Sequence, residues 1–279
     1  MSSPRPPSPL TLPVPPVDRH HHPAFRALKR RLRGVLWKHP SVYRWLFELR
    51  HDGRDQFRPS GAFWVVGYQR SGNTFAGLLL DELLFPGRVD FHLHVCSSLR
   101  IAADSGRPGV FVIRRPLEAA ISTAIFHRWP LIQALEDYVD LHRHWLQEVP
   151  DISVAPFEWF TRNPSAFLRE AARLADLTLV PDLVTPAVLE RIRVRTEGMF
   201  TSADGSLNEC QVARPSVFRS RLQRELTTAA RDSRRIQSLL ATAESLHQAF
   251  LLRSIEPAAA ETEVAMPEER GECQSLNVQ

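Results

Sequence analysis

The chain has 279 residues, a length that can bury one large core and favours a single α/β domain with tails. Its 35 Lys and Arg against 31 Asp and Glu residues give a net charge of +4, which suits an anionic ligand, but the arginines are scattered without a nucleic-acid reader motif. We therefore expect no nucleic-acid partner. No apolar run is long enough to cross a bilayer and the three cysteines are scattered, so we expect a cytoplasmic protein.

The N-terminal segment is predicted to be a tail. Residues 1–22 are rich in Pro and Ser, lack the apolar core of a secretory signal, and are expected to be disordered. The run His20–His22 fixes no metal geometry and is expected to be solvated. Residues 24–38 form a basic amphipathic pattern that could contact a membrane surface or a partner, although a helix docked on the domain is favoured.

Strand and helix patterns then alternate along residues 23–255, which we expect to form one domain. Strands are predicted at 62–67, 110–113 and 151–155, and helices near 73–85, 116–128, 131–147, 164–175, 183–193 and 221–252. This alternation is typical of a three-layer αβα fold with a central parallel sheet, in which ligands bind beyond the carboxyl ends of the strands. The acidic segment 256–279 lacks apolar periodicity and is expected to be a disordered tail.

An apolar run that ends at Gly67 leads into a glycine-bounded loop, and a helical pattern begins at Asn73. Strand, glycine loop and helix direct backbone N–H groups at a phosphate, as in P-loop nucleoside-triphosphatase folds. Gly67, Gly72 and Thr74 match the pattern G-x-x-x-x-G-K-[ST], but Asn73 replaces the lysine and the only cation of the loop is Arg70. The loop therefore predicts a phosphate cradle that does not run metal-assisted ATP chemistry.

The predicted strand 110–113 runs directly into a second anion-binding pattern. Arg114 follows the strand, Pro116 suits the first turn of a helix, and Ser122 lies about two turns into that helix. A guanidinium and a hydroxyl placed in this way can hold one phosphate together.

The two motifs in this order resemble those of the sulfotransferases that use 3′-phosphoadenosine 5′-phosphosulfate (PAPS) as sulfuryl donor. Residues 68–75 resemble the family's 5′-phosphosulfate loop, often written Y-P-K-S-G-T-T-W, and residues 114–122 resemble its 3′-phosphate motif, R-N-P-x-D-x-x-V-S. Residues 156–164 resemble a later, mainly structural element, Y-E-D-L-x-x-D-P. The resemblance covers residues 60 to 250 and implies sulfuryl transfer to an acceptor hydroxyl without a metal.

The resemblance implies a role for each residue of the first loop. Arg70 takes the position of the lysine that contacts the bridging oxygen of the leaving phosphate. A guanidinium can stabilise charge that develops on that oxygen. The 5′-phosphate would be held at the helix N-terminus by the Thr74 hydroxyl and by the backbone of Ser71, Gly72, Asn73 and Thr74.

The same resemblance implies contacts with the other end of the donor. Arg114 and Ser122 would hold the 3′-phosphate, and Phe75 takes the position of the aromatic residue that stacks on adenine, although it could equally be a core phenylalanine. In the family a C-terminal loop, R-K-G-x-x-G-D-W, closes over the donor. Here the nearest segment keeps Arg214 but lacks the glycines and the lysine, so Arg214 is the candidate clamp, and an arginine-rich helix start is the alternative.

The acceptor hydroxyl must lose a proton as it attacks sulfur. Residues 91–96 resemble the family's K-T-H-L-P element, and His94 matches its histidine, which implies that His94 is the general base. Histidine titrates near neutral pH and suits this role. Asp90 is the alternative base, and His127 is expected to lie on a helix face.

The acceptor itself stays open, as a small molecule, a lipid or a carbohydrate. The aromatic residues Phe126, Trp129, Trp145 and Phe200 would suit a lipidic or phenolic acceptor, but core packing explains them equally well. Two other functions stay open. One is a P-loop small-molecule kinase, which would need the missing lysine. The other is an inactive anion-binding scaffold whose N-terminal helix meets a membrane or a partner.

Overall fold

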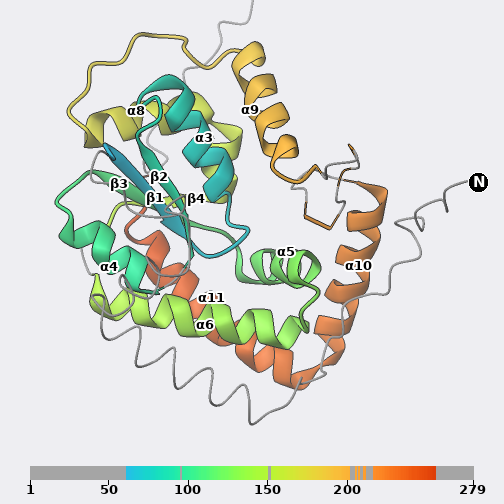
Figure 1. The fold of residues 1–279 in the computed structure, drawn as a ribbon. Helices are drawn as coiled ribbons and strands as arrows, with labels where there is room; N and C mark the ends of the chain where they lie inside the picture. Colours follow the sequence, from blue (N-terminus) through green and yellow to red (C-terminus); the bar gives the residue numbers. More distant parts are fainter. Residues whose placement is uncertain are drawn as a thin grey trace, which may run out of the picture.

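The structure is a computed structural model that describes residues 61–94, 96–149, 152–201, 205, 207, 210–211 and 216–255. Four strands form one sheet in the order β2-β1-β3-β4, and every neighbouring pair is parallel (Figure 1). The strands are β1 (Phe63–Gly67), β2 (Val89–Leu93), β3 (Gly109–Ile113) and β4 (Val154–Pro156). The α/β class and the parallel sheet are as predicted from the sequence.

Helices connect the strands and cover both faces of the sheet (Figure 1). They are α3 (Asn73–Leu83), α4 (Cys96–Asp104), α5 (Pro116–His127), α6 (Leu131–Glu148), α7 (Phe157–Arg162), α8 (Pro164–Leu174), α9 (Pro186–Gly198), α10 (Val217–Asp232) and α11 (Arg234–Leu251).

The strands form a buried layer because alternate apolar residues point to opposite faces of the sheet. In β1, Trp64 and Val66 pack into one cluster with residues of α4, α6 and α11. Phe63 and Val65 pack into another with residues of α3, α8 and α9. The result is a helix–sheet–helix arrangement compatible with a three-layer αβα fold.

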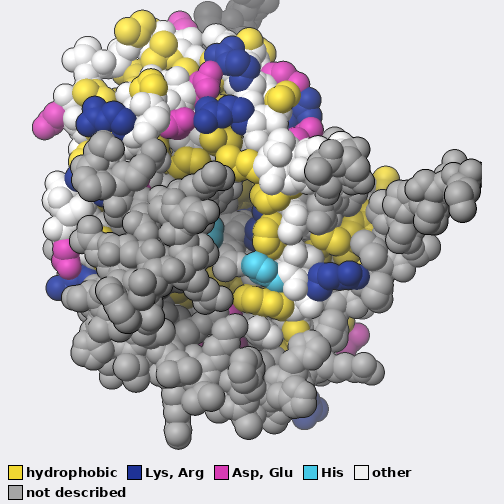
Figure 2. Space-filling view, in the orientation of Figure 1, with side chains coloured by type: hydrophobic (Ala, Val, Ile, Leu, Met, Phe, Trp, Pro, Cys, Tyr) yellow, Lys and Arg dark blue, Asp and Glu magenta, His cyan; other side chains and the backbone are white. Residues whose placement is uncertain are grey.

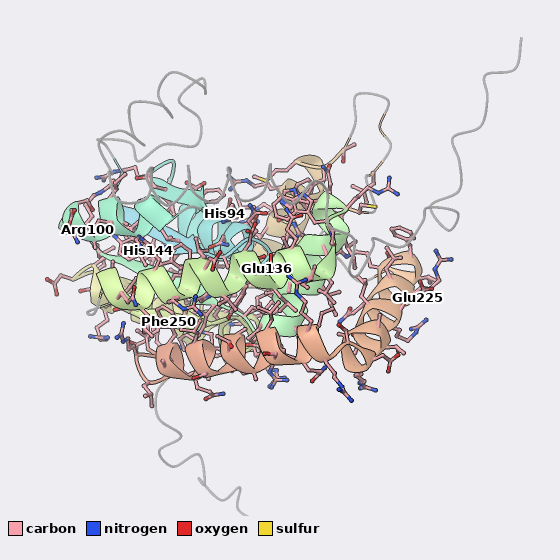
Figure 3. The ribbon with its side chains drawn as sticks, turned by 90° about the horizontal axis from the view of Figure 1, so that it is seen from below. His94, Arg100, Glu136, His144, Glu225 and Phe250 are labelled. Carbon is pink, nitrogen blue, oxygen red and sulfur yellow. The ribbon has the colours of Figure 1, made fainter. Side chains whose placement is uncertain are left out.

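The helices α6 and α11 lie side by side beneath the sheet, as Figures 1 and 3 show. Phe250 of α11 packs within 4.9 Å of the Phe111 ring of β3, measured between ring centroids. A third apolar cluster joins α5, α6, α10 and α11, so α10 and α5 are fixed to the same body as the sheet.

The structure corrects three features of the predicted element list. The helix expected over 221–252 is two helices, because Ser233 separates α10 from α11 and its hydroxyl accepts a hydrogen bond from the N–H of Ile236 at 3.4 Å. The strand β2 and the short helices α4 and α7 were not predicted. β2 alternates apolar and polar residues at all five positions, which is the pattern of a half-buried strand, so the signal was present in the sequence but short. The helix expected over 183–193 begins instead at Pro186, after Thr185, whose hydroxyl accepts from the N–H of Val188.

Several predicted segments lie outside the described residues. These are the leader 1–22, the amphipathic helix 24–38, the acidic tail 256–279 and the candidate clamp Arg214. Within the described part of the chain, no helix is both long and apolar enough to cross a membrane.

Candidate functional site

The loop between β1 and α3 turns its backbone amides toward one point. Arg70 has a φ of 64° and Gly72 a φ of 94°, both in the left-handed region. Alternation of right- and left-handed residues is the geometry that forms an anion-binding concavity of N–H groups. The Ser71 N–H closes the turn on the Tyr68 carbonyl at 3.2 Å, and no side chain caps the N-terminus of α3. The first amides of α3 therefore remain directed at the cavity.

Two glycines make this turn possible. A Cβ at Gly67 would lie 2.4 Å from the carbonyl oxygen of Val112, so the strand could not approach β3 as closely. A Cβ at Gly72 would meet the rings of Phe157 and Phe160, each at 2.7 Å, in a conformation that side chains rarely adopt.

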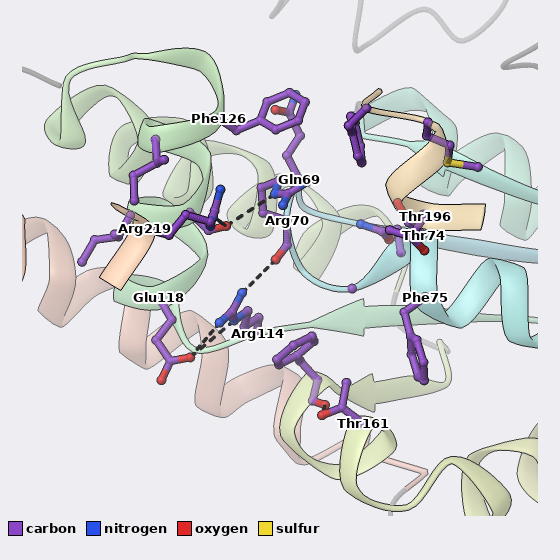
Figure 4. A pocket seen from close by; sticks show the side chains of 18 of the residues that line it. Gln69, Arg70, Thr74, Phe75, Arg114, Glu118, Phe126, Thr161, Thr196 and Arg219 are labelled. Carbon is purple, nitrogen blue, oxygen red and sulfur yellow. Dashed lines mark hydrogen bonds and ion pairs between the residues drawn. The ribbon is translucent and has the colours of Figure 1, made fainter. Parts of the chain in front are cut away.

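Register brings the second motif to the same edge of the sheet. Gly67 of β1 lies opposite Val112 of β3, so both chains leave the sheet side by side. Arg114 then donates from Nη1 to the carbonyl oxygen of Arg70 at 3.3 Å. Its guanidinium also pairs with Glu118 at 3.1 Å and lies 4.3 Å from the Phe157 ring centroid (Figure 4). The segment 156–164, which resembles Y-E-D-L-x-x-D-P, thus contributes the Phe157 ring to the site.

The Ser122 hydroxyl joins the two motifs. It accepts from Arg70 Nε at 3.4 Å and from Arg219 Nη2 at 3.1 Å. Arg219 also donates from Nη1 to the Cys210 carbonyl oxygen at 2.7 Å. Arginines from three distant segments, the β1–α3 loop, the end of β3 and the start of α10, therefore converge on one corner of the cavity (Figure 4).

The three guanidiniums give this corner a concentrated positive charge that suits an anion. Burial, followed by the charges of Arg219 and Arg114, lowers the pKa of Arg70 to about 9. The shift reflects first the free energy required to remove the charged guanidinium from water, and second its repulsion by the two like charges. Glu118 offsets part of the charge through Arg114. An anionic ligand would relieve the repulsion among the three guanidiniums.

The remaining residues of the first loop differ in exposure. Ser71 is fully buried, and its Oγ has no hydrogen-bond partner among the described residues. Asn73 is nearly buried and donates from Nδ2 to the Tyr68 carbonyl at 2.8 Å, which fixes the loop in the place where a Walker lysine would project. Thr74 and Phe75 line the cavity, and the Phe75 ring stacks on Phe160 at a centroid distance of 6.2 Å.

His94 follows β2 and lines the same cavity. Its Nδ1 lies 3.0 Å from the carbonyl oxygen of Gly67 and 3.5 Å from Asn73 Nδ2. Because a carbonyl oxygen only accepts, we infer that Nδ1 carries the proton and Nε2 keeps the lone pair. This tautomer is the one that could accept a proton through Nε2.

Asp90, the alternative base, lies elsewhere. It lies toward the amino end of β2, where its carboxylate accepts from Arg107 Nη1 at 2.9 Å, and its side chain is 1% exposed. It does not line the cavity that holds His94 and Arg70. The geometry therefore disfavours Asp90 as a base, because the carboxylate is buried in an ion pair toward the amino end of β2 and does not line the cavity.

The cavity has a volume of about 990 Å³ and extends from the arginines toward α9. Figure 2 shows it as a hollow with hydrophobic side chains and a histidine along its exposed rim.

His127, expected on a helix face, lines the cavity and pairs through Nε2 with the side chain of Gln69. Burial and then the charge of Arg70 lower the pKa of His127, against the opposing effect of Asp137. Of the four aromatics considered, Phe126 and Phe200 line the cavity, whereas Trp145 is part of the core.

Arg219, Phe157 and Gln69 are site residues that the sequence interpretation did not identify. Arg219 lies five residues after Arg214, which was assigned the clamp. The N-cap residue of α10, Ser216, is the sequence feature that separates Arg219 from Arg214. Ser216 accepts from the Arg219 N–H at 3.2 Å, which places Arg219 in the first turn of a helix that points at Ser122.

Comparison of the whole chain with protein-family models and with curated proteins finds no match. Among the described residues, no group of three or more His, Cys, Asp or Glu side chains is arranged to hold a metal ion. The assignment of function therefore depends on the geometry of the site and on the motifs.

Proposed function

We propose that this protein is a sulfotransferase that moves a sulfuryl group from PAPS to an acceptor hydroxyl, on a P-loop-like αβα fold. The observation that carries the proposal is the convergence of both motifs on one hydroxyl. Ser122 of the second motif accepts from Arg70 of the first and from Arg219. Two separate anion-binding elements that share one corner suit a donor with two phosphate groups.

The residues divide between the two ends of the donor. The amides of Gly72, Asn73 and Thr74 and the Thr74 hydroxyl would bind the 5′-phosphate. Arg114, Ser122 and Arg219 would bind the 3′-phosphate, with Arg219 in the role first expected of Arg214. Phe75 and Phe157 offer ring faces beside these groups, which suits an adenine base.

The chemistry would be an in-line displacement at sulfur. The acceptor oxygen forms a bond to sulfur, the bond from sulfur to the bridging phosphate oxygen breaks, and His94 Nε2 takes the acceptor proton. The electron pair of the broken bond stays on the bridging oxygen, where the Arg70 guanidinium would stabilise it. Adenosine 3′,5′-bisphosphate leaves as the second product.

A P-loop kinase would use the same fold but needs a lysine that reaches the β- and γ-phosphates. Asn73 stands in that position with its amide held by the Tyr68 carbonyl. Binding calorimetry with adenosine 3′,5′-bisphosphate, adenosine 5′-monophosphate and ATP with Mg²⁺ separates the two functions. We expect the bisphosphate to bind at least about tenfold more tightly than either other nucleotide, the effect of one good charged contact. Equal or tighter binding of ATP with Mg²⁺ would overturn the proposal.

Catalysis is tested separately with donor labelled in the sulfuryl group. We expect labelled product in a panel of phenols, aliphatic alcohols and sugars, or slow release of sulfate to water when no acceptor is added. Binding of the bisphosphate without either outcome would favour the inactive scaffold instead.

A further inference from the structure

The cavity continues beyond the arginines along a largely apolar surface, here called the acceptor wall. Helix α5 and the segment at and after α9 form it from opposite sides (Figure 4). Its surface is formed by the half-buried side chains of Phe126, Leu189 and Phe200, and the almost fully buried Ile121, Ile125 and Ile192 support them from behind. The proposed donor contacts account for the polar corner of the cavity but leave this wall without a role.

Several polar side chains beside the acceptor wall already have a partner, either another side chain or a backbone carbonyl. The Thr196 hydroxyl donates to the Ile192 carbonyl oxygen at 2.8 Å. Arg193 pairs with Glu190 at 2.6 Å and with Glu197 at 2.7 Å. On the α5 side, His127 pairs with the Gln69 side chain.

This arrangement disfavours a sugar. A carbohydrate body carries several hydroxyls, and each one that enters an apolar surface without a partner loses its hydrogen bonds to water. An apolar body gains free energy from the same surface in proportion to the area it buries. The wall therefore selects for a molecule with few polar groups besides the reacting hydroxyl.

The acceptor wall is joined to the reacting end of the site. Phe126 packs edge-on against Phe200 at a centroid distance of 6.0 Å. Phe126 also lies beside the Arg70 guanidinium, 4.8 Å from the ring centroid, and beside the His127 ring, at a centroid distance of 4.7 Å. A molecule lying on these rings would thus end beside the arginine that is assigned to the leaving group.

The wall is also held in place. Arg195 bonds to Asp81 and to Glu82, each at 3.0 Å, and Arg191 bonds to Glu82 at 2.9 Å. These pairs attach α9 to α3, the helix whose N-terminus faces the donor. A preformed apolar surface binds a rigid or extended hydrocarbon without ordering a loop first.

We propose that the acceptor is a phenol or aliphatic alcohol with an apolar body, bound on the acceptor wall, and that carbohydrates are excluded. This inference rests on the proposed function. The chemistry common to both classes is one hydroxyl on a hydrocarbon, and the test distinguishes the aromatic from the aliphatic source.

The test measures binding in the presence of saturating adenosine 3′,5′-bisphosphate, with 2-naphthol, decan-1-ol and maltose as probes. We expect at least one of the first two to bind, and maltose not to bind. Phe200→Ala should weaken that binding by about tenfold or more, because it removes most of one aromatic face. Val194→Ala is the control, since Val194 lies on α9, just before Phe200, is 54% exposed and does not line the cavity. It should leave binding unchanged.

The outcomes separate the two proposals. If the unaltered protein does not bind adenosine 3′,5′-bisphosphate, the proposed function is contradicted. Retained bisphosphate binding together with binding of maltose, or of none of the probes, overturns the acceptor inference alone. The acceptor inference is also overturned if Phe200→Ala, Phe200→Leu and the unaltered protein bind 2-naphthol or decan-1-ol with equal affinity. The Phe200→Leu variant keeps an apolar side chain, so it tests the surface even if the alanine variant does not fold.

Discussion

Arg70 Nε lies 3.4 Å from the hydroxyl oxygen of Ser122, although the two residues are 52 positions apart in the chain. Parallel pairing of β1 with β3 creates this proximity, because both residues follow strands that end at the same edge. The contact joins a loop that would hold one phosphate to a helix that would hold another. Its consequences can be measured at each partner.

Ser122→Ala should reduce the preference for adenosine 3′,5′-bisphosphate over adenosine 5′-monophosphate. The hydroxyl orients Arg70 and Arg219 and would contact the 3′-phosphate itself. We expect the ratio of the two dissociation constants to fall about five- to tenfold, the usual effect of one lost hydrogen bond. Ser165→Ala, on the exposed face of α8, is the control and should leave the ratio unchanged. An unaltered ratio in Ser122→Ala would place the 3′-phosphate elsewhere.

Arg219→Met should weaken binding of the bisphosphate more strongly than Ser122→Ala, because a charged contact is lost while the aliphatic stem is kept. We expect a loss of about tenfold or more in affinity, which calorimetry measures directly. Arg224→Met removes an exposed arginine from the same helix and controls for net charge. If both variants bind equally well, Arg219 has no role in the donor site.

The comparison of Arg219 with Arg214 shows where sequence patterns are sufficient and where they are not. Arg70, Arg114 and Ser122 were found from the sequence because each follows a strand by a fixed number of residues, and the sheet then fixes their positions. Arg219 comes from α10, far along the chain, and its approach depends on how α10 packs against α5. The cap at Ser216 marks where α10 begins, but contacts between distant segments decide what its first turn faces, and no local spacing encodes those contacts. The strand β2 was missed for a different reason, because its five alternating apolar and polar residues are a short signal, whereas its pairing with β1 identifies it directly.

His94→Gln should abolish sulfuryl transfer while the bisphosphate still binds. Glutamine can preserve a hydrogen bond to the Gly67 carbonyl through its amide group, but it cannot accept a proton near neutral pH. We expect a decrease of about 100-fold or more in the turnover rate, measured with labelled donor and the best acceptor. Normal turnover in this variant would show that another group removes the proton.

Asp90→Asn should behave in the opposite way. The Asp90 carboxylate is buried and bonded to Arg107, so its loss leaves a weaker contact in the interior. We expect unfolding free energy to fall by about 1–3 kcal/mol, with turnover per folded molecule unchanged. Chemical denaturation and the activity assay together check this. A stable but inactive Asp90→Asn protein would restore Asp90 as a candidate base.

Gly72→Ala should damage both the fold and the donor site. The added Cβ would require a φ of 94° and would collide with Phe157 and Phe160. We expect a loss of at least about 1–3 kcal/mol of stability and much weaker bisphosphate binding, since the loop must change shape. Gly87→Ala is a useful comparison, because its φ is also positive, 68°, but nothing lies within 4 Å of the added Cβ. It should lose stability through strain alone and keep its affinity for the bisphosphate.

Stability should decrease on acidification because of His142, which is fully buried in the core beside Tyr138 and Trp145. Burial lowers the pKa of His142 to about 3, although its hydrogen bond to the Tyr138 carbonyl opposes the shift and the nearby His247 adds to it. In the unfolded chain the group titrates near its usual value of about 6.5. The unfolded state therefore binds the extra proton between these two values, and the free energy of unfolding falls as pH decreases from 6.5 toward 3.

For one group the slope approaches about 1.4 kcal/mol per pH unit in the middle of that interval. Urea denaturation at several pH values between 7 and 4.5 measures it. His142→Leu keeps an apolar side chain in the core but has no proton to bind, so its stability should depend less steeply on pH. Equal slopes for the two proteins would show that His142 does not control acid unfolding. The comparison uses slopes rather than absolute stabilities, so it stays informative even if the leucine packs less well.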